Sequence, residues 1–142
     1  MIKNHPIIVC TICCREKDKA EGDLPAIQRY KSKRIDTVAG LARKAHRPLV
    51  ILSGKYGLID ADKPIPYYDK LMGTDDVGDI IGKNIFFLEE NKVGKVIFIC
   101  PDPVIDPHVK PYLRSIQAAA RGTACELETI FVPPFPGSIL EY

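Results

Sequence analysis

Four short apolar runs, separated by stretches with helical periodicity, constrain the fold of this chain most strongly. The runs are rich in β-branched residues and occupy residues 6–12, 49–52, 95–100 and 126–132. Continuous apolar runs of this length are typical of strands that are buried on both faces of a parallel sheet. Strands that alternate with helices along a chain indicate βαβ units. We therefore predict an α/β fold with three layers, in which flanking helices cover a mostly parallel four-stranded sheet.

Three helices are predicted from apolar side chains at core spacing, over residues 33–46, 74–88 and 106–122. The apolar stripe of the first helix leaves Arg34, Arg43 and Lys44 outside it, so we expect these three cations to face solvent. In the third segment Pro111 would interrupt a helix interior, which places the start of regular helix near Lys110.

The length and composition predict one compact domain that spans residues 1–142. The chain has 142 residues, of which 46% are hydrophobic and 27% are charged. It contains no apolar run of about 18 residues, and its first residues lack the features of a signal peptide, so we expect a cytoplasmic protein with no membrane partner. An odd number of cysteines, five, also fits a reducing compartment. The sequence leaves the oligomeric state open.

The charge of the chain is small overall but unevenly distributed. Residues 15–47 hold ten basic and five acidic residues, net +5 against +2 for the whole chain, which leaves −3 for the rest. Such a segment can form a basic face that attracts a phosphate-bearing ligand or nucleic acid. A solvated helix surface gives the same count and is the more common explanation.

The second apolar run ends in an unusual cluster, Ser53-Gly54-Lys55-Tyr56-Gly57. It lacks the preceding glycine and the immediate helix of a Walker phosphate loop. Its glycines are expected to allow a turn with positive φ, or the close approach of a ligand to the backbone. The cluster opens a connection over residues 53–73, and a second long connection covers residues 13–32. Because both leave the carboxyl ends of parallel strands, we expect them to meet at the ligand-binding edge of the sheet.

Further polar residues in these connections are candidate ligand contacts. The carboxylate of Asp69 and the phenols of Tyr67 and Tyr68 follow the cluster closely. A carboxylate beside a cation can orient a water molecule, and aromatic rings can sandwich a planar base. For Asp60 and Asp62, in contrast, we prefer the interpretation as turn residues.

The cysteines near the first run are interpreted as small buried hydrophobic residues. On an extended strand Cys10 and Cys13 face opposite sides of the sheet, so they cannot share one zinc ion with Cys14 there. A site made of Cys13, Cys14, Cys100 and His108 is conceivable where strand ends converge, but no second CxxC and no His-x-x-x-His pair supports it. We expect neither a metal nor another cofactor.

Taken together, these motifs resemble a family of small bacterial and phage domains of unknown function. The matching residues are Cys13 or Cys14 followed by Lys17, then Pro25-Ala26 and Tyr30, then ILSGKYGLI and IPYYD. The family core reads approximately Leu-Ser-Ala/Gly-Lys-Tyr/His-Gly-Leu and then Pro-Tyr-Asp. The same portion is similar to YaaA-like peroxide-stress proteins and, more faintly, to a domain of archaeosine synthases. The resemblance covers about residues 6–72, and it implies a uracil-DNA-glycosylase-like fold and a link to nucleic acids or modified bases.

These observations lead to two hypotheses about function. In the first, the chain recognises a nucleobase, a nucleotide or nucleic acid and possesses N-glycosidase-like hydrolase activity. Asp69 and Lys55 are then the catalytic candidates. The ligand-binding candidates are Lys17, Tyr30, Ser53, Gly54, Tyr56, Gly57 and Tyr68. In the second hypothesis the chain is a non-catalytic nucleic-acid-binding module or a structural partner of another protein.

Overall fold

A mostly parallel five-stranded sheet forms the centre of the fold. The computed structural model describes residues 5–133. The four predicted strands are confirmed as β1 (Ile7–Ile12), β3 (Leu49–Ser53), β6 (Lys95–Pro101) and β7 (Glu126–Val132), and they pair in parallel. A fifth strand, β4 (Gly57–Asp60), pairs antiparallel with β3, so the order is β4-β3-β1-β6-β7. The predicted count of four strands is therefore one too low.

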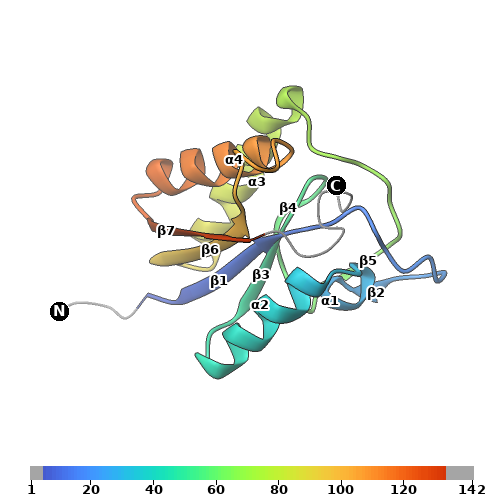
Figure 1. The fold of residues 1–142 in the computed structure, drawn as a ribbon. Coiled ribbons are helices and arrows are strands. Elements are labelled where there is room, and N and C mark those ends of the chain that lie inside the picture. The colour runs from blue at the N-terminus through green and yellow to red at the C-terminus, as the bar shows by residue number, and fades with distance from the viewer. Residues whose placement is uncertain (1–4, 134–142) are drawn as a thin grey trace.

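Helices cover both faces of this sheet, as Figure 1 shows. Helix α2 (Lys33–Lys44) lies on one face, and α3 (Val77–Glu90) and α4 (Val109–Gly122) lie together on the other. A short 3-10 turn, η1 (Thr74–Asp76), precedes α3. Helix α4 begins beside Lys110, so Pro111 lies in its first turn, where its missing N–H breaks no helical hydrogen bond. The three-layer α/β architecture is confirmed.

The two long connections contain structure of their own and are paired with each other. Residues 13–32 include β2 (Leu24–Pro25) and the short helix α1 (Ala26–Arg29), and residues 53–73 include β4 and β5 (Pro64–Ile65). Strands β2 and β5 form a small antiparallel sheet. The predicted meeting of the two connections is therefore confirmed.

The prediction that Arg34 faces solvent is wrong. Its side chain is buried, and its guanidinium donates hydrogen bonds to Thr11 Oγ1 at 2.6 Å, to the Ile12 carbonyl at 2.8 Å and to the Cys13 carbonyl at 3.1 Å. A planar guanidinium carries five donors and can satisfy several acceptors at once. Arg34 thus fixes the start of α2 to the carboxyl end of β1, from which the first long connection departs.

Asn84 fixes the edge strand β4 to the helical layer above it. Its side chain is fully buried, accepts a hydrogen bond from the Leu58 N–H at 3.0 Å, and donates one to Ser115 Oγ at 3.3 Å. One amide therefore links β4, α3 and α4. It also occupies a backbone donor of β4 that would otherwise be open at the sheet edge.

Candidate functional site

The cluster that follows the second apolar run is the turn of the β3–β4 hairpin. Ser53 pairs with Gly57 across the hairpin. The Ser53 hydroxyl accepts hydrogen bonds from the N–H groups of Lys55 and Tyr56, both at 3.0 Å. Serine hydroxyls commonly close turns in this way. The hydroxyl of Ser53, which the sequence suggested as a ligand contact, is thus used inside the protein.

Both glycines of the turn are required by the packing of the chain itself. Gly57 has a φ of +73°, which non-glycine residues rarely adopt. A Cβ added at Gly54 would lie 2.9 Å from the backbone nitrogen of Met72 and 2.9 Å from Tyr112 Oη. The chain that approaches Gly54 closely is therefore the end of the second long connection.

Replacing Gly54 by alanine is expected to lower the free energy of unfolding by about 1–3 kcal/mol, because the new methyl group displaces the backbone at Met72. Urea unfolding measures the difference. Gly78→Ala is the matched control: this helical glycine has nothing within 4 Å of an added Cβ, so a gain of about 0.5–1 kcal/mol is expected. If Gly54→Ala is as stable as the unaltered chain, the backbone at Met72 moves to accommodate the methyl group without a cost in free energy.

Tyr68 is the point at which the two long connections meet. Its hydroxyl is hydrogen-bonded to Ser53 Oγ at 2.9 Å and, more closely still, to the hydroxyl of Tyr30. The ammonium nitrogen of Lys17 lies 4.7 Å from the centre of the Tyr68 ring, and that of Lys55 lies 5.5 Å from it. Cations at these distances are attracted by the electron-rich face of an aromatic ring. The lysines of both connections therefore converge on one phenol.

The hydrogen bond between Ser53 and Tyr68 has a defined direction. Ser53 Oγ already accepts two backbone N–H groups, which occupies both of its lone pairs, so its proton points to the Tyr68 oxygen. A further hydrogen bond joins the hydroxyl groups of Tyr68 and Tyr30. Burial raises the pKa of both Tyr30 and Tyr68 above the ordinary value, so both phenols are neutral near neutral pH. Neither ring supplies a base.

The tyrosines differ in how much ring surface they leave free. Tyr30 is 2% exposed and Tyr68 is 6% exposed, whereas Tyr56 is only half-buried. The Tyr56 and Tyr30 rings pack edge-to-face against Tyr68, with centroids 5.4 Å and 6.2 Å away. In this conformation Tyr56 alone of the three offers surface to a ligand.

A cavity of about 120 Å³ lies beside Tyr68, between the first long connection and the end of the second. Its buried residues form the floor and its exposed residues form the rim. The floor consists of Cys13, Cys14, Lys17 and Tyr112, and the rim of Arg15, Asp69, Lys70 and Leu71. Two predicted site residues, Lys17 and Asp69, thus line one cavity. Lys55 is exposed and does not line it, although it contacts the same tyrosine.

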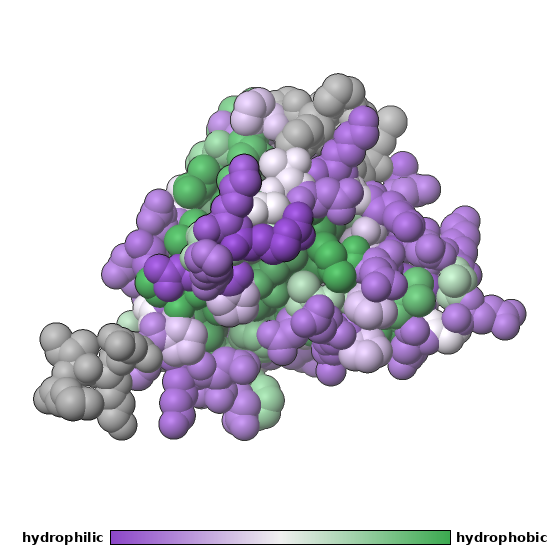
Figure 2. Space-filling model, turned by 90° about the horizontal axis from the view of Figure 1, so that it is seen from below, coloured by the Kyte–Doolittle hydropathy of each residue, from purple (hydrophilic) through white to green (hydrophobic). Residues whose placement is uncertain are grey.

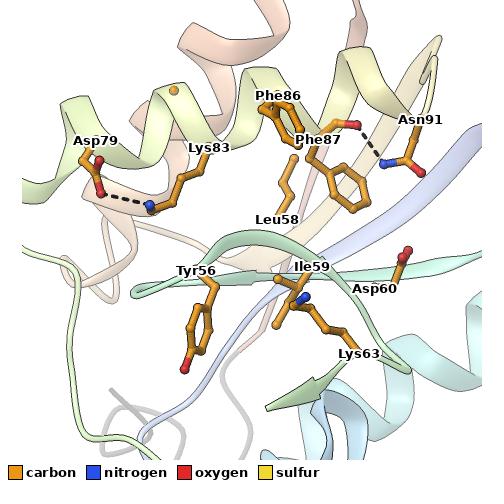
Figure 3. Close-up of a pocket in the computed structure, with 11 residues that line it drawn as sticks. Tyr56, Leu58, Ile59, Asp60, Lys63, Asp79, Lys83, Phe86, Phe87 and Asn91 are labelled. Carbon is orange, nitrogen blue, oxygen red and sulfur yellow. Dashed lines mark hydrogen bonds and ion pairs between the residues drawn. The ribbon is translucent and has the colours of Figure 1, made fainter. Parts of the chain in front are cut away.

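A larger groove of about 600 Å³ lies on the other side of the hairpin turn, between β4 and α3 (Figure 3). Phe86 and Phe87 line it from α3, and Tyr56 and Lys63 lie across from them. Phe86 is 67% exposed. No motif in the sequence marks these phenylalanines as site residues. The available signal was the position of Phe86 outside the apolar stripe of its helix, where an aromatic side chain has no core to enter.

The cysteines behave as buried residues of the core. All five are buried, and none of them forms a disulfide. Burial raises the pKa of Cys100 to about 12 and raises that of Cys10 further, so both are protonated thiols near neutral pH. Between residues 5 and 133 no three His, Cys, Asp or Glu side chains gather in a way that could hold a metal ion, so Cys13, Cys14, Cys100 and His108 do not form such a group.

The basic segment presents less charge to solvent than its composition suggests. Three of its ten basic residues, Lys17, Arg29 and Arg34, are buried. Seven basic residues then oppose five acidic ones on the surface of residues 15–47. Viewed from the side that carries α2, the molecule shows hydrophilic groups over most of its surface, with apolar groups visible between them (Figure 2). The charge of this segment is therefore a weak argument for a nucleic-acid-binding face.

Comparison with known proteins does not place the chain in a family. No model of a protein family, no curated protein and no solved structure matches it. Among the described residues, no helix has the length and apolar character needed to span a membrane.

Proposed function

We propose that this chain is a domain that recognises a nucleobase-containing ligand, a nucleoside or nucleotide, at the carboxyl edge of its sheet. The observation that carries the proposal is the convergence of Lys17 and Lys55 on Tyr68, next to a cavity with Asp69 on its rim. Open α/β sheets bind ligands at this edge. The YaaA-like resemblance and a uracil-DNA-glycosylase-like topology belong to the same proposal.

The two hollows differ in the size of the group that each can accept. Pockets for small organic ligands measure roughly 300–1,000 Å³. The groove of about 600 Å³ lies within this range, and Tyr56, Phe86 and Phe87 give it the flat apolar surfaces on which a base can stack. The cavity of about 120 Å³ accommodates a single small group. We therefore propose that the base stacks on the aromatic residues of the groove and not on Tyr30 or Tyr68.

The reaction that this arrangement favours is hydrolysis of an N-glycosidic bond. The bond between the sugar carbon and the base nitrogen breaks, a new bond forms between that carbon and the oxygen of water, and the departing base takes up a proton. In this scheme the exposed carboxylate of Asp69 accepts the proton of the attacking water or stabilises the positive charge that develops on the sugar. Lys55 holds a phosphate or the departing base.

Bases, nucleosides and nucleotides are expected to raise the melting temperature of the full chain in a thermal-shift screen. A ligand present at about 100 times its Kd stabilises the folded state by roughly 2.7 kcal/mol, which corresponds to about 5–10 °C for a domain of this size. Analysis of the incubated samples by liquid chromatography then shows whether a free base is released. A screen in which no compound of these three classes shifts the transition would contradict the proposal.

The alternative of a structural or interaction module is supported by one observation. Ser53, Gly54 and Gly57 all serve the packing of the hairpin, so the cluster around them has a complete explanation without a ligand. A negative result in the ligand screen would favour this alternative.

A further inference from the structure

We propose that the cavity between residues 13–17 and 69–71 binds one oxyanion of the phosphoryl class, and that Lys17 is its principal contact. The inference deepens the proposed function, because it concerns the same edge of the sheet and names the group that enters the smaller hollow.

The Lys17 ammonium group is buried and has few partners among the described residues. The residue is 7% exposed, and its nitrogen makes one hydrogen bond, to the Arg15 carbonyl at 3.1 Å. An ammonium has three donors, and within residues 5–133 no carboxylate lies at ion-pair distance from this one. The faces of Tyr68 and Tyr30, with centroids at 4.7 Å and 5.8 Å, are its remaining partners. A buried cation without an anion is unfavourable, and an oxyanion in the cavity would supply the missing charge.

The charged residues that line the cavity are mostly cations. Arg15, Lys17 and Lys70 contribute three cations and Asp69 contributes one carboxylate. Lys70 is held by Asp76 at 3.2 Å, so Lys17 and Arg15 are the cations that remain for a ligand. The Asp69 carboxylate lies on the exposed rim, where solvent screens its repulsion.

The size of the cavity also fits a single oxyanion. A cavity of about 120 Å³ lies well below the roughly 300–1,000 Å³ of pockets that enclose a whole small organic ligand. A phosphate or sulfate ion fits such a space, whereas a complete nucleotide does not. The cavity therefore selects one group of a ligand and leaves the rest outside.

Calorimetric titration of the full chain with inorganic phosphate tests the inference. Phosphate is expected to bind in the millimolar range or tighter, and Lys17→Met is expected to weaken binding roughly tenfold or more, since charge-assisted contacts at a buried site are lost. Arg15→Gln removes an exposed cation and should weaken binding about two- to fivefold. Lys44→Met, an exposed lysine at the end of α2 and outside the cavity lining, is the control and should leave the affinity unchanged.

An independent readout covers the case in which Lys17→Met does not fold. Phosphate added to the unaltered isotope-labelled chain should shift the amide resonances of residues 14–17 and 69–71 more than those of the rest. No binding at 10 mM phosphate (about the weak end of the expected range), equal binding by Lys17→Met, or shifts elsewhere on the surface would overturn the inference.

Titrations with other ligands test the class of the anion and separate this inference from the proposed function. Sulfate should compete with phosphate, while acetate, a carboxylate, should compete less. If phosphate binds at the cavity but no nucleobase compound stabilises the chain beyond phosphate, the inference holds and the proposed function falls. If nucleosides bind as tightly as nucleotides and phosphate does not bind, the inference falls and the proposed function holds.

Discussion

Replacing Arg29 by methionine is expected to lower the free energy of unfolding by about 3–5 kcal/mol, the largest loss among the stability variants considered. The Arg29 side chain is fully buried in the first long connection. It donates to the carbonyl oxygens of Asp18 at 2.6 Å, Ala20 at 3.0 Å and Ile65 at 3.1 Å, and also to that of Gly22. Methionine has no donors, so these acceptors lose their partner and the connection loses one of its attachments to β5.

The loss should appear as a decrease of roughly 10 °C or more in the melting temperature. Hydrogen exchange should locate it first in residues 16–25, since the carbonyl groups held by Arg29 lie there. Arg29→Lys retains the charge but lacks the planar fork, so only partial recovery is expected. Arg43→Met, an exposed arginine on α2, is the matched control, with a change within about 0.5 kcal/mol. A methionine variant as stable as this control would show that the connection keeps its shape without the guanidinium.

Replacing Asp69 by asparagine is expected to reduce release of the free base at least about 100-fold, if the chain hydrolyses N-glycosidic bonds as proposed. An amide at this position cannot accept the proton of the attacking water, and general-base groups contribute roughly 10²–10⁴-fold to the rate. Because Asp69 is exposed, the melting temperature should change little. The decrease should appear in kcat more than in KM, since the carboxylate acts on the attacking water.

Asp62→Asn is the matched control for this experiment. Asp62 is also an exposed carboxylate of the second long connection, but it does not line the cavity. Its turnover should equal that of the unaltered chain. Turnover retained in Asp69→Asn would remove Asp69 from the mechanism, and a parallel decrease in both variants would indicate a general effect of surface charge.

The four parallel strands and three main helices were predictable because their signals are local. A continuous apolar run or a stripe at helical spacing is complete within about ten residues, and it needs no knowledge of its partners. Strand β4 has no such local signal, so the sequence did not predict it. Its four residues follow a turn so closely that they were interpreted as a loop, and only pairing with β3 makes them a strand.

The candidate site was predicted in part. The sequence indicated that Lys17, Lys55, Tyr68 and Asp69 belong to connections that leave the same edge, and the structure brings all four close to one tyrosine or one cavity. It did not indicate which side chains are buried. Ser53 and both glycines of the turn are occupied by the fold, and the phenylalanines of α3 line a groove that no motif marked.

The sequence by itself determined the α/β class, the parallel strands and the edge at which the long connections emerge, because backbone preference and apolar spacing are properties of neighbouring residues. Only the tertiary structure decided the environment of each charge. Lys17, Arg29 and Arg34 look like ordinary surface cations in the sequence, yet each is buried among carbonyl groups or aromatic rings contributed in part by distant segments. The energy of a charge depends on whatever surrounds it in space, and residues far apart in the chain supply those surroundings.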